Sequence, residues 1–446
     1  MEPLPPPSLV ASLLSSAVTS AAAVWQSLVP APLDFLSPPE VVVAPEASLT
    51  LVAFALAGAT LGTLSGLTPG LHANNFALLL ASTATAIPGS ATAVGVAMLS
   101  AGVVHTFLDV VPALALGVPD PAMAATALPG HRLVIQGRGR EALRLSAVGS
   151  GLAVALAVPL AVPITRLMTT IYPTVRANLS ALLVGVVVFL VATESSTRAR
   201  VGGVVCVAVS GALGTVTLDV SPAAPLDAGG MLAPLFAGLF GAPVLVDAMD
   251  GAGVPPQADA LLAMPERDLG LTALAGSGAG ALVGYLPGVS SAIASVVALP
   301  AVPGRSGARG FLVATSGANT ANTIFALFAL LALGTPRTGV MVALETAAVP
   351  RSLPVLLSAA VFAAAFAFPV VVLVGDRYLR VVGRTDYTTL SVAVLSLLTV
   401  VSYLFAGLVG VATFLAAALV GLLPPRFGTR RVHLMGVLLV PLGLGL

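Results

Sequence analysis

Residues 62–75 read GTLSGLTPGLHANN and place the pair Pro69-Gly70 at the end of a glycine-rich, apolar run. Proline removes a backbone hydrogen-bond donor and clashes with the preceding turn, while glycine relaxes the φ/ψ limits. A membrane-spanning helix would be expected to continue through this point, so the sequence predicts a broken helix. In lipid such a break is tolerated only where it is buried in protein or lines a wet cavity.

The composition excludes an ordinary soluble domain. Of the 446 residues, 57% are hydrophobic and only 8% are charged, whereas soluble domains carry about 25% charged residues. The apolar runs are about 20 residues long, as in membrane-spanning helices, and do not alternate in polarity as β-barrel strands do. We therefore expect a multi-pass protein of the cell membrane, an all-α polytopic fold embedded in the lipid bilayer with about 10 to 12 transmembrane segments. The expected spans include those at about 48–67, 143–165, 177–193, 269–286, 388–406 and 408–423, and a weaker apolar segment lies at 9–29.

The charged residues, histidines and cysteine give no sign of nucleic-acid binding, a metal site or catalysis. The formal net charge of +1 suggests no nucleic-acid partner. The four histidines show no metal-ligand spacing and the single cysteine, Cys206, lies in an apolar run, so we expect no metal, no disulfide and no cofactor. The chain has no Gly-x-Ser-x-Gly elbow and no His-Glu-x-x-His motif, which argues against an enzyme.

The opening motif recurs far downstream, where residues 280–291 read GALVGYLPGVSS. All four glycine and proline positions of the first copy recur at one constant spacing, from Gly62 at Gly280 onward. The run Leu-Ala-Leu-Gly that ends at Gly117 recurs with its end at Gly334, at nearly the same spacing. Two motifs in nearly one register predict two homologous halves, which we expect to be inverted repeats. The expected division is an N-terminal segment and loop at 1–47, a first repeat at 48–247, a linker at 248–268 and a second repeat at 269–446.

Hydrophobic segments interrupted by Gly and Pro at corresponding places of two halves are the best sequence pointer to a secondary-transporter site. A half-helix that starts inside the membrane directs unpaired N–H groups and a positive dipole end at its cavity, where a carboxylate is the natural guest. We therefore expect the substrate to bind at the breaks and at nearby polar residues. These are Thr68, Pro69, Gly70, His72, Asn74, Asn75, Pro287, Gly288, Ser290, Ser291, Asn319, Asn322, Gly334, Thr335, Pro336 and Arg337.

Each of these residue types also has a purely structural interpretation. The hydroxyl and amide groups after the breaks could be helix caps, and Asn319 and Asn322 could hold two helices together. Arg337 could extend to the membrane surface. Glu194 and Glu345 lie near span ends, where we expect them to be solvated. The arginines of the polar loop expected at 130–144 place that loop in the cytoplasm by the positive-inside rule.

His105 and Asp109 are four residues apart on one expected span and so lie on the same helical face. Ionisable residues inside a membrane segment are functional candidates by default, and histidine titrates near neutral pH. The pair is therefore our candidate for ion coupling, with H⁺ or Na⁺ as the coupling ion. A polar pair that locks two helices together is the alternative.

Three further stretches resemble a known family when they are read in order with the first break. They are the His131-Arg132 and Gly137-Arg138 loop, Ala318-Asn319 to Asn322 followed by Leu333-Gly334-Thr335-Pro336, and the closing segment Arg431 to Gly436. Together they resemble the large permease subunit of tripartite tricarboxylate transporters, from about residue 50 to the end. The resemblance implies a duplicated carrier that moves a carboxylate-type solute with an ion gradient. It also implies a small membrane subunit and an extracytoplasmic solute-binding protein as partners.

The sequence thus favours a secondary active permease for a small organic anion that works by alternating access with ion coupling. Two alternatives remain. One is a non-conducting membrane subunit or scaffold, and the other is a membrane-embedded enzyme with His72 or the His105/Asp109 pair as acid–base groups. A homo-oligomer is compatible with either reading.

Overall fold

The computed structural model describes residues 45–69, 71, 73–83, 87–117, 127–226, 230–249, 254–259, 262–286 and 289–445, which form helices and connections without a strand. The apolar segment expected at 9–29 lies outside these residues. So do four expected site residues, Gly70, His72, Pro287 and Gly288, and the side chains of Asn74 and Asn75.

The chain up to residue 249 forms eight helices and one further interrupted helix among the described residues. They are α2 (Pro45–Gly66), α3 (Ala73–Thr83), α4 (Ala91–Leu108), α5 (Val110–Leu116), α6 (Ala127–Ile135), α7 (Gly139–Ala177), α8 (Leu179–Ala192) and α9 (Thr197–Thr217). The interrupted helix consists of α10 (Leu232–Phe236), a π-helical turn η4 (Ala237–Gly241) and α11 (Ala242–Ala248).

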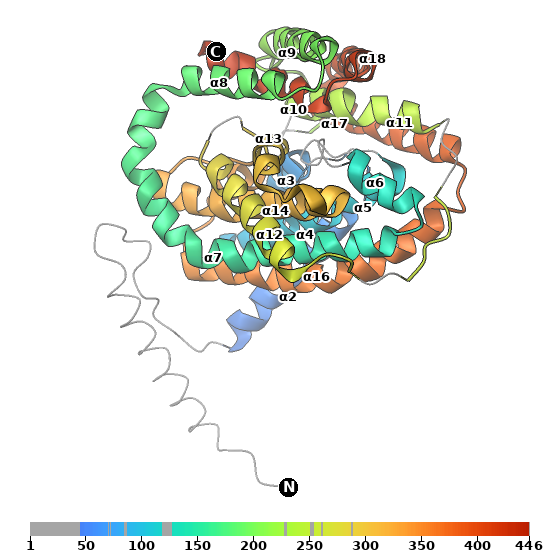
Figure 1. The fold of residues 1–446 in the computed structure, drawn as a ribbon. Coiled ribbons are helices and arrows are strands. Elements are labelled where there is room, and N and C mark those ends of the chain that lie inside the picture. The colour runs from blue at the N-terminus through green and yellow to red at the C-terminus, as the bar shows by residue number, and fades with distance from the viewer. Residues whose placement is uncertain are drawn as a thin grey trace.

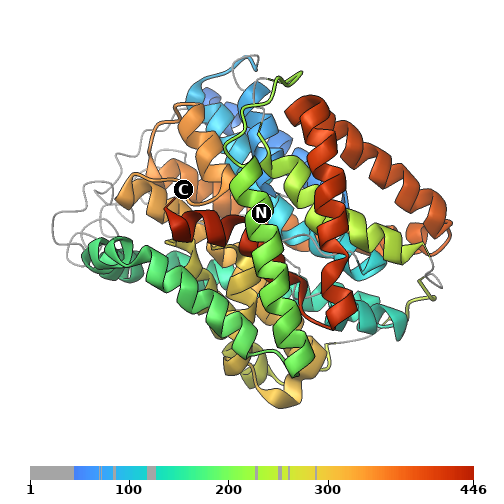
Figure 2. The same ribbon diagram turned by 90° about the horizontal axis from the view of Figure 1, so that it is seen from above.

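The later part of the chain begins with α12 (Glu266–Gly284), α13 (Ser291–Ala298) and α14 (Gly307–Leu333), with short 3₁₀ turns at Leu299–Ala301 and Gly304–Ser306. It continues through α15 (Gly339–Thr346), α16 (Leu353–Val382), α17 (Tyr387–Gly421), α18 (Leu423–Phe427), the 3₁₀ turn η7 (Arg431–Met435) and α19 (Gly436–Leu444). Figure 1 shows α4, α12 and α14 at the centre, with α7 curving along one side. Figure 2 shows α9 crossing the adjacent face, where it packs against α19.

Seven helices of the described chain are long and apolar enough to cross a membrane. Four shorter apolar helices accompany them: Leu179–Ala192, Leu232–Ala248, Ser291–Ala301 and Arg431–Leu444. The all-helical membrane fold is therefore confirmed, while the count of 10 to 12 crossings stays a prediction. The two spans expected at 388–406 and 408–423 are two helices within α17, which meet at a kink where Ala406 and Gly407 are non-helical, so the expected division is confirmed.

Two expectations about the region 130–193 were wrong. The polar loop expected at 130–144 contains α6, whose Leu133 and Val134 are buried, and α7 already begins at Gly139. The connection expected between the spans at 143–165 and 177–193 is helical instead, because α7 is one helix of 39 residues that runs through three prolines to Ala177 before α8 begins at Leu179. Because a helix satisfies its backbone groups within itself, prolines inside an apolar segment bend it rather than end it.

Glycines allow two helix pairs at the centre to approach closely. A Cβ on Gly58 or Gly62 of α2 would collide with a carbonyl oxygen of α4, that of Ala97 or Ala101. A Cβ on Gly280 of α12 would likewise lie only 2.7 Å from a carbonyl oxygen of α14. Small residues permit this backbone contact between membrane helices.

We expect Gly280→Ala to lower the free energy of unfolding by about 1–3 kcal/mol, because an added methyl group must push α12 away from α14. Gly278→Ala is the matched control, since a Cβ at Gly278 meets nothing within 4 Å. Cys206 is the only cysteine and is buried, so a thiol-reactive fluorophore reports thermal unfolding directly. Equal melting temperatures for the two variants would contradict the tight contact.

Candidate functional site

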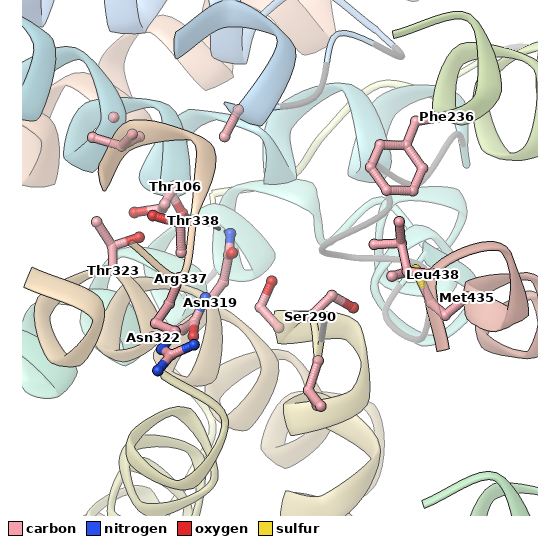
Figure 3. Close-up of a pocket in the computed structure, with 15 residues that line it drawn as sticks. Thr106, Phe236, Ser290, Asn319, Asn322, Thr323, Arg337, Thr338, Met435 and Leu438 are labelled. Carbon is pink, nitrogen blue, oxygen red and sulfur yellow. Dashed lines mark hydrogen bonds between the residues drawn. The ribbon is translucent and has the colours of Figure 1, made fainter. Parts of the chain in front are cut away.

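A cavity of about 90 Å³ lies between α4, α13 and α14 (Figure 3). Five of the expected substrate-binding residues line it: Ser290, Ser291, Asn319, Asn322 and Arg337. They come from three separate places in the chain, namely the start of α13, the middle of α14 and the connection that follows α14. Three threonines that the sequence did not single out add hydroxyl groups to the same walls: Thr106, Thr323 and Thr338.

The other described candidates do not line this cavity. Thr68 and Pro69 form the turn after α2, and the Thr68 hydroxyl donates to the carbonyl of Leu64 at 2.9 Å. Gly334 caps the end of α14 at φ 67°, a left-handed conformation that favours glycine. Thr335 and Pro336 then connect α14 to Arg337. These residues lie in the connections between helices and not in the cavity wall.

Ser290 occupies the N-cap position of α13 with an extended backbone, yet its side chain makes no cap hydrogen bond. Its buried hydroxyl oxygen makes no hydrogen bond to any residue that the structure describes. Thr338, the N-cap of α15, differs because its hydroxyl accepts from the Met341 amide at 3.4 Å. The cap interpretation therefore accounts for Thr338 but leaves the Ser290 hydroxyl available at the cavity.

Asn319 joins the cavity to a buried carboxylate. Its amide nitrogen donates to Asp109 Oδ2 at 2.6 Å, and both side chains are almost fully buried. Asp109 lies at the junction of α4 and α5, where one helix ends and the next begins. One side chain therefore connects the cavity wall with the candidate coupling group.

His105 and Asp109 make different contacts, although they share a helix face. His105 Nδ1 lies 2.9 Å from the Ser65 hydroxyl of α2, and the ring stacks on Phe76 of α3 with 6.5 Å between centroids. Asp109 contacts α14 instead. The predicted pair thus links α4 to three other helices.

Arg337 is anchored by an aromatic residue that no sequence pattern singles out. Its Nη2 donates to the hydroxyl of Tyr172 on α7, and the guanidinium lies 5.0 Å from the centre of the Tyr172 ring. Such a contact favours a cation over a ring face. The Arg337 Nε is buried and makes no hydrogen bond to a described residue. One donor of the guanidinium therefore has no partner among the described residues, and Arg337 lines the cavity.

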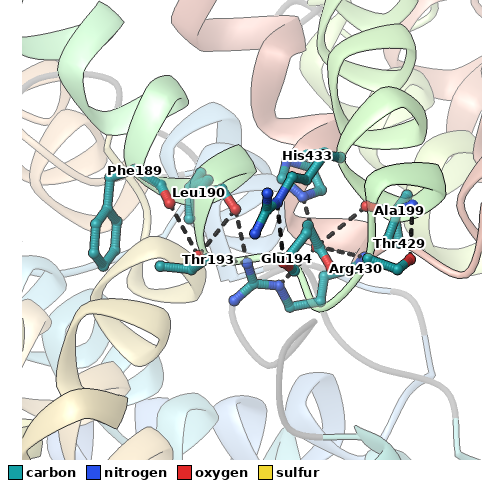
Figure 4. A network of polar contacts seen from close by, with 10 residues as sticks. Phe189, Leu190, Thr193, Glu194, Ala199, Thr429, Arg430 and His433 are labelled. Atoms are coloured by element: carbon teal, nitrogen blue, oxygen red, sulfur yellow. Dashed lines mark hydrogen bonds and ion pairs between the residues drawn. The ribbon is translucent and has the colours of Figure 1, made fainter.

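Glu194 is buried, so the expectation that it is solvated was wrong. Figure 4 shows it at the centre of a network that joins the α8–α9 connection to the C-terminal segment. Its Oε1 accepts from the Thr429 hydroxyl at 3.1 Å, from Arg430 Nε at 2.8 Å and from His433 Nε2 at 2.7 Å. These partners lie in the last part of the chain, which no local pattern around Glu194 indicates. Glu345, by contrast, is exposed.

We expect Glu194→Gln to cost about 3 kcal/mol of stability, because it leaves the half-buried Arg430 guanidinium without its carboxylate. Burial raises the pKa of Glu194, but hydrogen bonds from Arg430 and His433 outweigh it and hold the pKa below its ordinary value. A depressed carboxyl pKa stabilises the fold above the ordinary pKa of about 4.3, and this contribution is lost as pH falls through the folded-state pKa.

Circular dichroism melts at pH 7 and near pH 4 measure both effects. The melting temperature of the wild type should fall between pH 7 and pH 4, and that of Glu194→Gln should fall less. Glu345→Gln is the control, because Glu345 forms an exposed pair with Arg351 and should change stability by no more than about 0.5 kcal/mol. Identical pH dependence in wild type and Glu194→Gln would contradict the role of the network.

Comparison with known proteins identifies relatives of the chain. A family model described as the tripartite tricarboxylate transporter TctA family matches residues 52–436. An uncharacterized protein of Methanocaldococcus jannaschii is 25% identical over 295 residues, which cover 66% of this chain and 72% of that protein. No solved structure matches the chain.

Proposed function

The chain belongs to the tripartite tricarboxylate transporter TctA family, and on that premise we propose that it is a secondary active carrier whose anionic substrate binds in the cavity beside Arg337. The family is one of transporters and not of enzymes. With seven helices of sufficient length and apolarity, the chain is a multi-pass protein of the plasma membrane. The substrate class proposed is a small organic carboxylate.

The convergence of five expected residues on one cavity is the observation that carries this proposal. Arg337 offers a planar fork that matches the two oxygens of a carboxylate. The hydroxyl of Ser290 and the amide of Asn322 offer neutral hydrogen-bond donors in the same space. A pocket with a few converging polar groups of this kind is the default binding-site hypothesis.

The cavity also supports the proposal that the chain is duplicated, with repeats at 48–247 and 269–446 joined by the linker at 248–268. Gly102 and Thr106 of α4 line it together with Asn319 and Thr323 of α14, and each pair has the spacing that separates Gly117 from Gly334. A two-fold axis between α4 and α14 would generate this pairing. If that axis lies in the membrane plane, the repeats are inverted and the proposed alternating access is a rocking of one repeat against the other.

The glycine contacts are consistent with the same register. The α2–α4 contact of Gly62 with Ala101 recurs as the α12–α14 contact of Gly280 with Ala318. The two contacts are thus related by the same spacings as the sequence motifs. In this proposal Pro69-Gly70 and Pro287-Gly288 interrupt equivalent helices, and His72, Asn74 and Asn75 remain candidates for the first-repeat side of the site.

We propose that ion coupling runs through Asp109, with His105 as its neighbour on α4. An ionised carboxylate close to the cavity disfavours an incoming anion, and in a medium of low polarity this repulsion is large. Binding of H⁺ or Na⁺ at Asp109 removes the repulsion, so ion and anion should bind together. The Asn319 amide, which contacts Asp109 and lines the cavity, is the direct physical link.

Uptake into proteoliposomes tests the proposal. Purified protein should accumulate a radiolabelled carboxylate from a panel that includes citrate, succinate and phenylacetate when a Na⁺ or pH gradient is imposed, and not when the gradient is collapsed. The same assay with a small membrane subunit and an extracytoplasmic solute-binding protein tests the partners that a tripartite system implies. Binding without uptake under every gradient would favour the non-conducting subunit.

A further inference from the structure

The cavity has two chemically different walls, which Figure 3 shows at opposite sides of the view. One wall is polar and carries the side chains of Thr106, Asn319, Asn322 and Arg337. The other presents Phe236, Met435 and Leu438. A guest that fills the space must therefore bring a polar end and an apolar end.

The polar wall provides for a single negative charge. Among the lining residues that the structure describes, Arg337 alone carries a formal charge. One guanidinium matches one carboxylate, whereas each further buried carboxylate without a cationic partner carries a large desolvation penalty. A tricarboxylate would bring two such charges into this space.

The apolar wall is built by two unusual pieces of structure. Phe236 is the last residue of α10, directly before the π-helical turn η4, and such turns occur often at functional sites. Met435 ends η7, the turn that contains His433, and His433 is held by buried Glu194. Both side chains are buried in one apolar cluster and line the cavity.

We infer that the substrate is a monocarboxylate with an apolar body, aromatic or branched, rather than a tricarboxylate. The inference rests on the proposed function. The carboxylate binds Arg337, Asn322 and the Ser290 hydroxyl, and the apolar body lies against Phe236, Met435 and Leu438. An aromatic ring gains a favourable contact with both the Phe236 ring and the methionine sulfur.

Binding can be measured on the full chain as a ligand-induced shift in melting temperature, with Cys206 labelling as the readout. The ligands are phenylacetate, 3-methylbutanoate, citrate and the neutral analogue phenylacetamide. Phenylacetate should bind at least tenfold more tightly than citrate, and phenylacetamide should not bind detectably. Citrate binding more tightly than phenylacetate would overturn the inference and leave the proposed function standing. Failure of every carboxylate to bind would overturn both.

Variants of the apolar wall provide an independent readout. Phe236→Ala should weaken phenylacetate binding at least tenfold and change acetate binding less than twofold. The control is Phe368→Ala, at an exposed position, which should affect the binding of neither ligand. Leu438→Asn, at a half-buried position, should act like Phe236→Ala and serves if that variant does not fold. Equal weakening of acetate and phenylacetate would overturn the assignment of this wall to the substrate body.

Discussion

Arg337→Gln should weaken carboxylate binding by about 30-fold or more. Removing one partner of a buried, hydrogen-bonded charge pair costs about 2–5 kcal/mol, and each 1.4 kcal/mol is about tenfold in affinity. The effect should be this large because Arg337 is the one formal charge among the described residues that line the cavity. Isothermal titration or the melting-temperature assay with the best-binding carboxylate measures it.

Two companion variants separate the charge from its geometry. Arg337→Lys keeps the charge but loses the planar fork, so its carboxylate affinity should lie between those of the wild type and Arg337→Gln. Tyr172→Phe keeps the ring under the guanidinium and removes the hydroxyl that accepts from it, so it should reduce affinity by less than Arg337→Lys. Arg351→Gln, which breaks only an exposed pair, is the control. Wild-type affinity in Arg337→Gln would contradict the site.

Asp109→Asn should uncouple anion binding from the ion gradient. Coupling free energies between two ligands are typically about 1–3 kcal/mol, or about 5- to 150-fold in affinity. In the wild type, anion affinity should rise by such a factor when Na⁺ is raised, if Na⁺ is the coupling ion, or when pH is lowered, if H⁺ is. In Asp109→Asn, which is neutral and similar in shape, this dependence should vanish, and gradient-driven accumulation should vanish with it.

Anion affinity measured across Na⁺ concentration at fixed pH, and across pH at fixed Na⁺, identifies the ion. Because thermodynamic coupling is reciprocal, bound anion should increase the affinity for the coupling ion by the same factor. Asp247→Asn is the control, since Asp247 is about half exposed and pairs with Arg431, and neither residue lines the cavity. Unchanged ion dependence in Asp109→Asn would transfer the coupling role to another group.

The sequence predicted the elements whose signals are local. The apolar run before Pro69 was expected to span 48–67, and α2 covers Pro45–Gly66. The run before Pro287 was expected at 269–286, and α12 covers Glu266–Gly284. Ser290, Asn319 and Arg337 could be selected because polar groups beside Gly and Pro in an apolar chain are conspicuous, and the structure brings them to one cavity.

The remainder depends on contacts between distant parts of the chain. Tyr172 is one of five tyrosines, and its contact joins α7 to Arg337 far along the chain. Glu194 follows an apolar helix, where solvation is the usual outcome, and its burial depends on Arg430 and His433. Phe236 and Met435 look like ordinary core residues in sequence. Because no short-range pattern marks them, the apolar half of the cavity could not be predicted.

Protection of introduced cysteines by the substrate tests most directly whether the two halves share one anion site. Cys206 is the only native cysteine and is buried, so Ala73→Cys, Ser290→Cys and Asn322→Cys can be labelled one at a time by a charged thiol reagent. A shared anion site predicts that one carboxylate, phenylacetate or citrate, slows labelling at all three positions, in each variant with a half-protecting concentration equal to that variant's own dissociation constant. Protection at Ser290→Cys and Asn322→Cys with none at Ala73→Cys, or no protection at any of them, would contradict it.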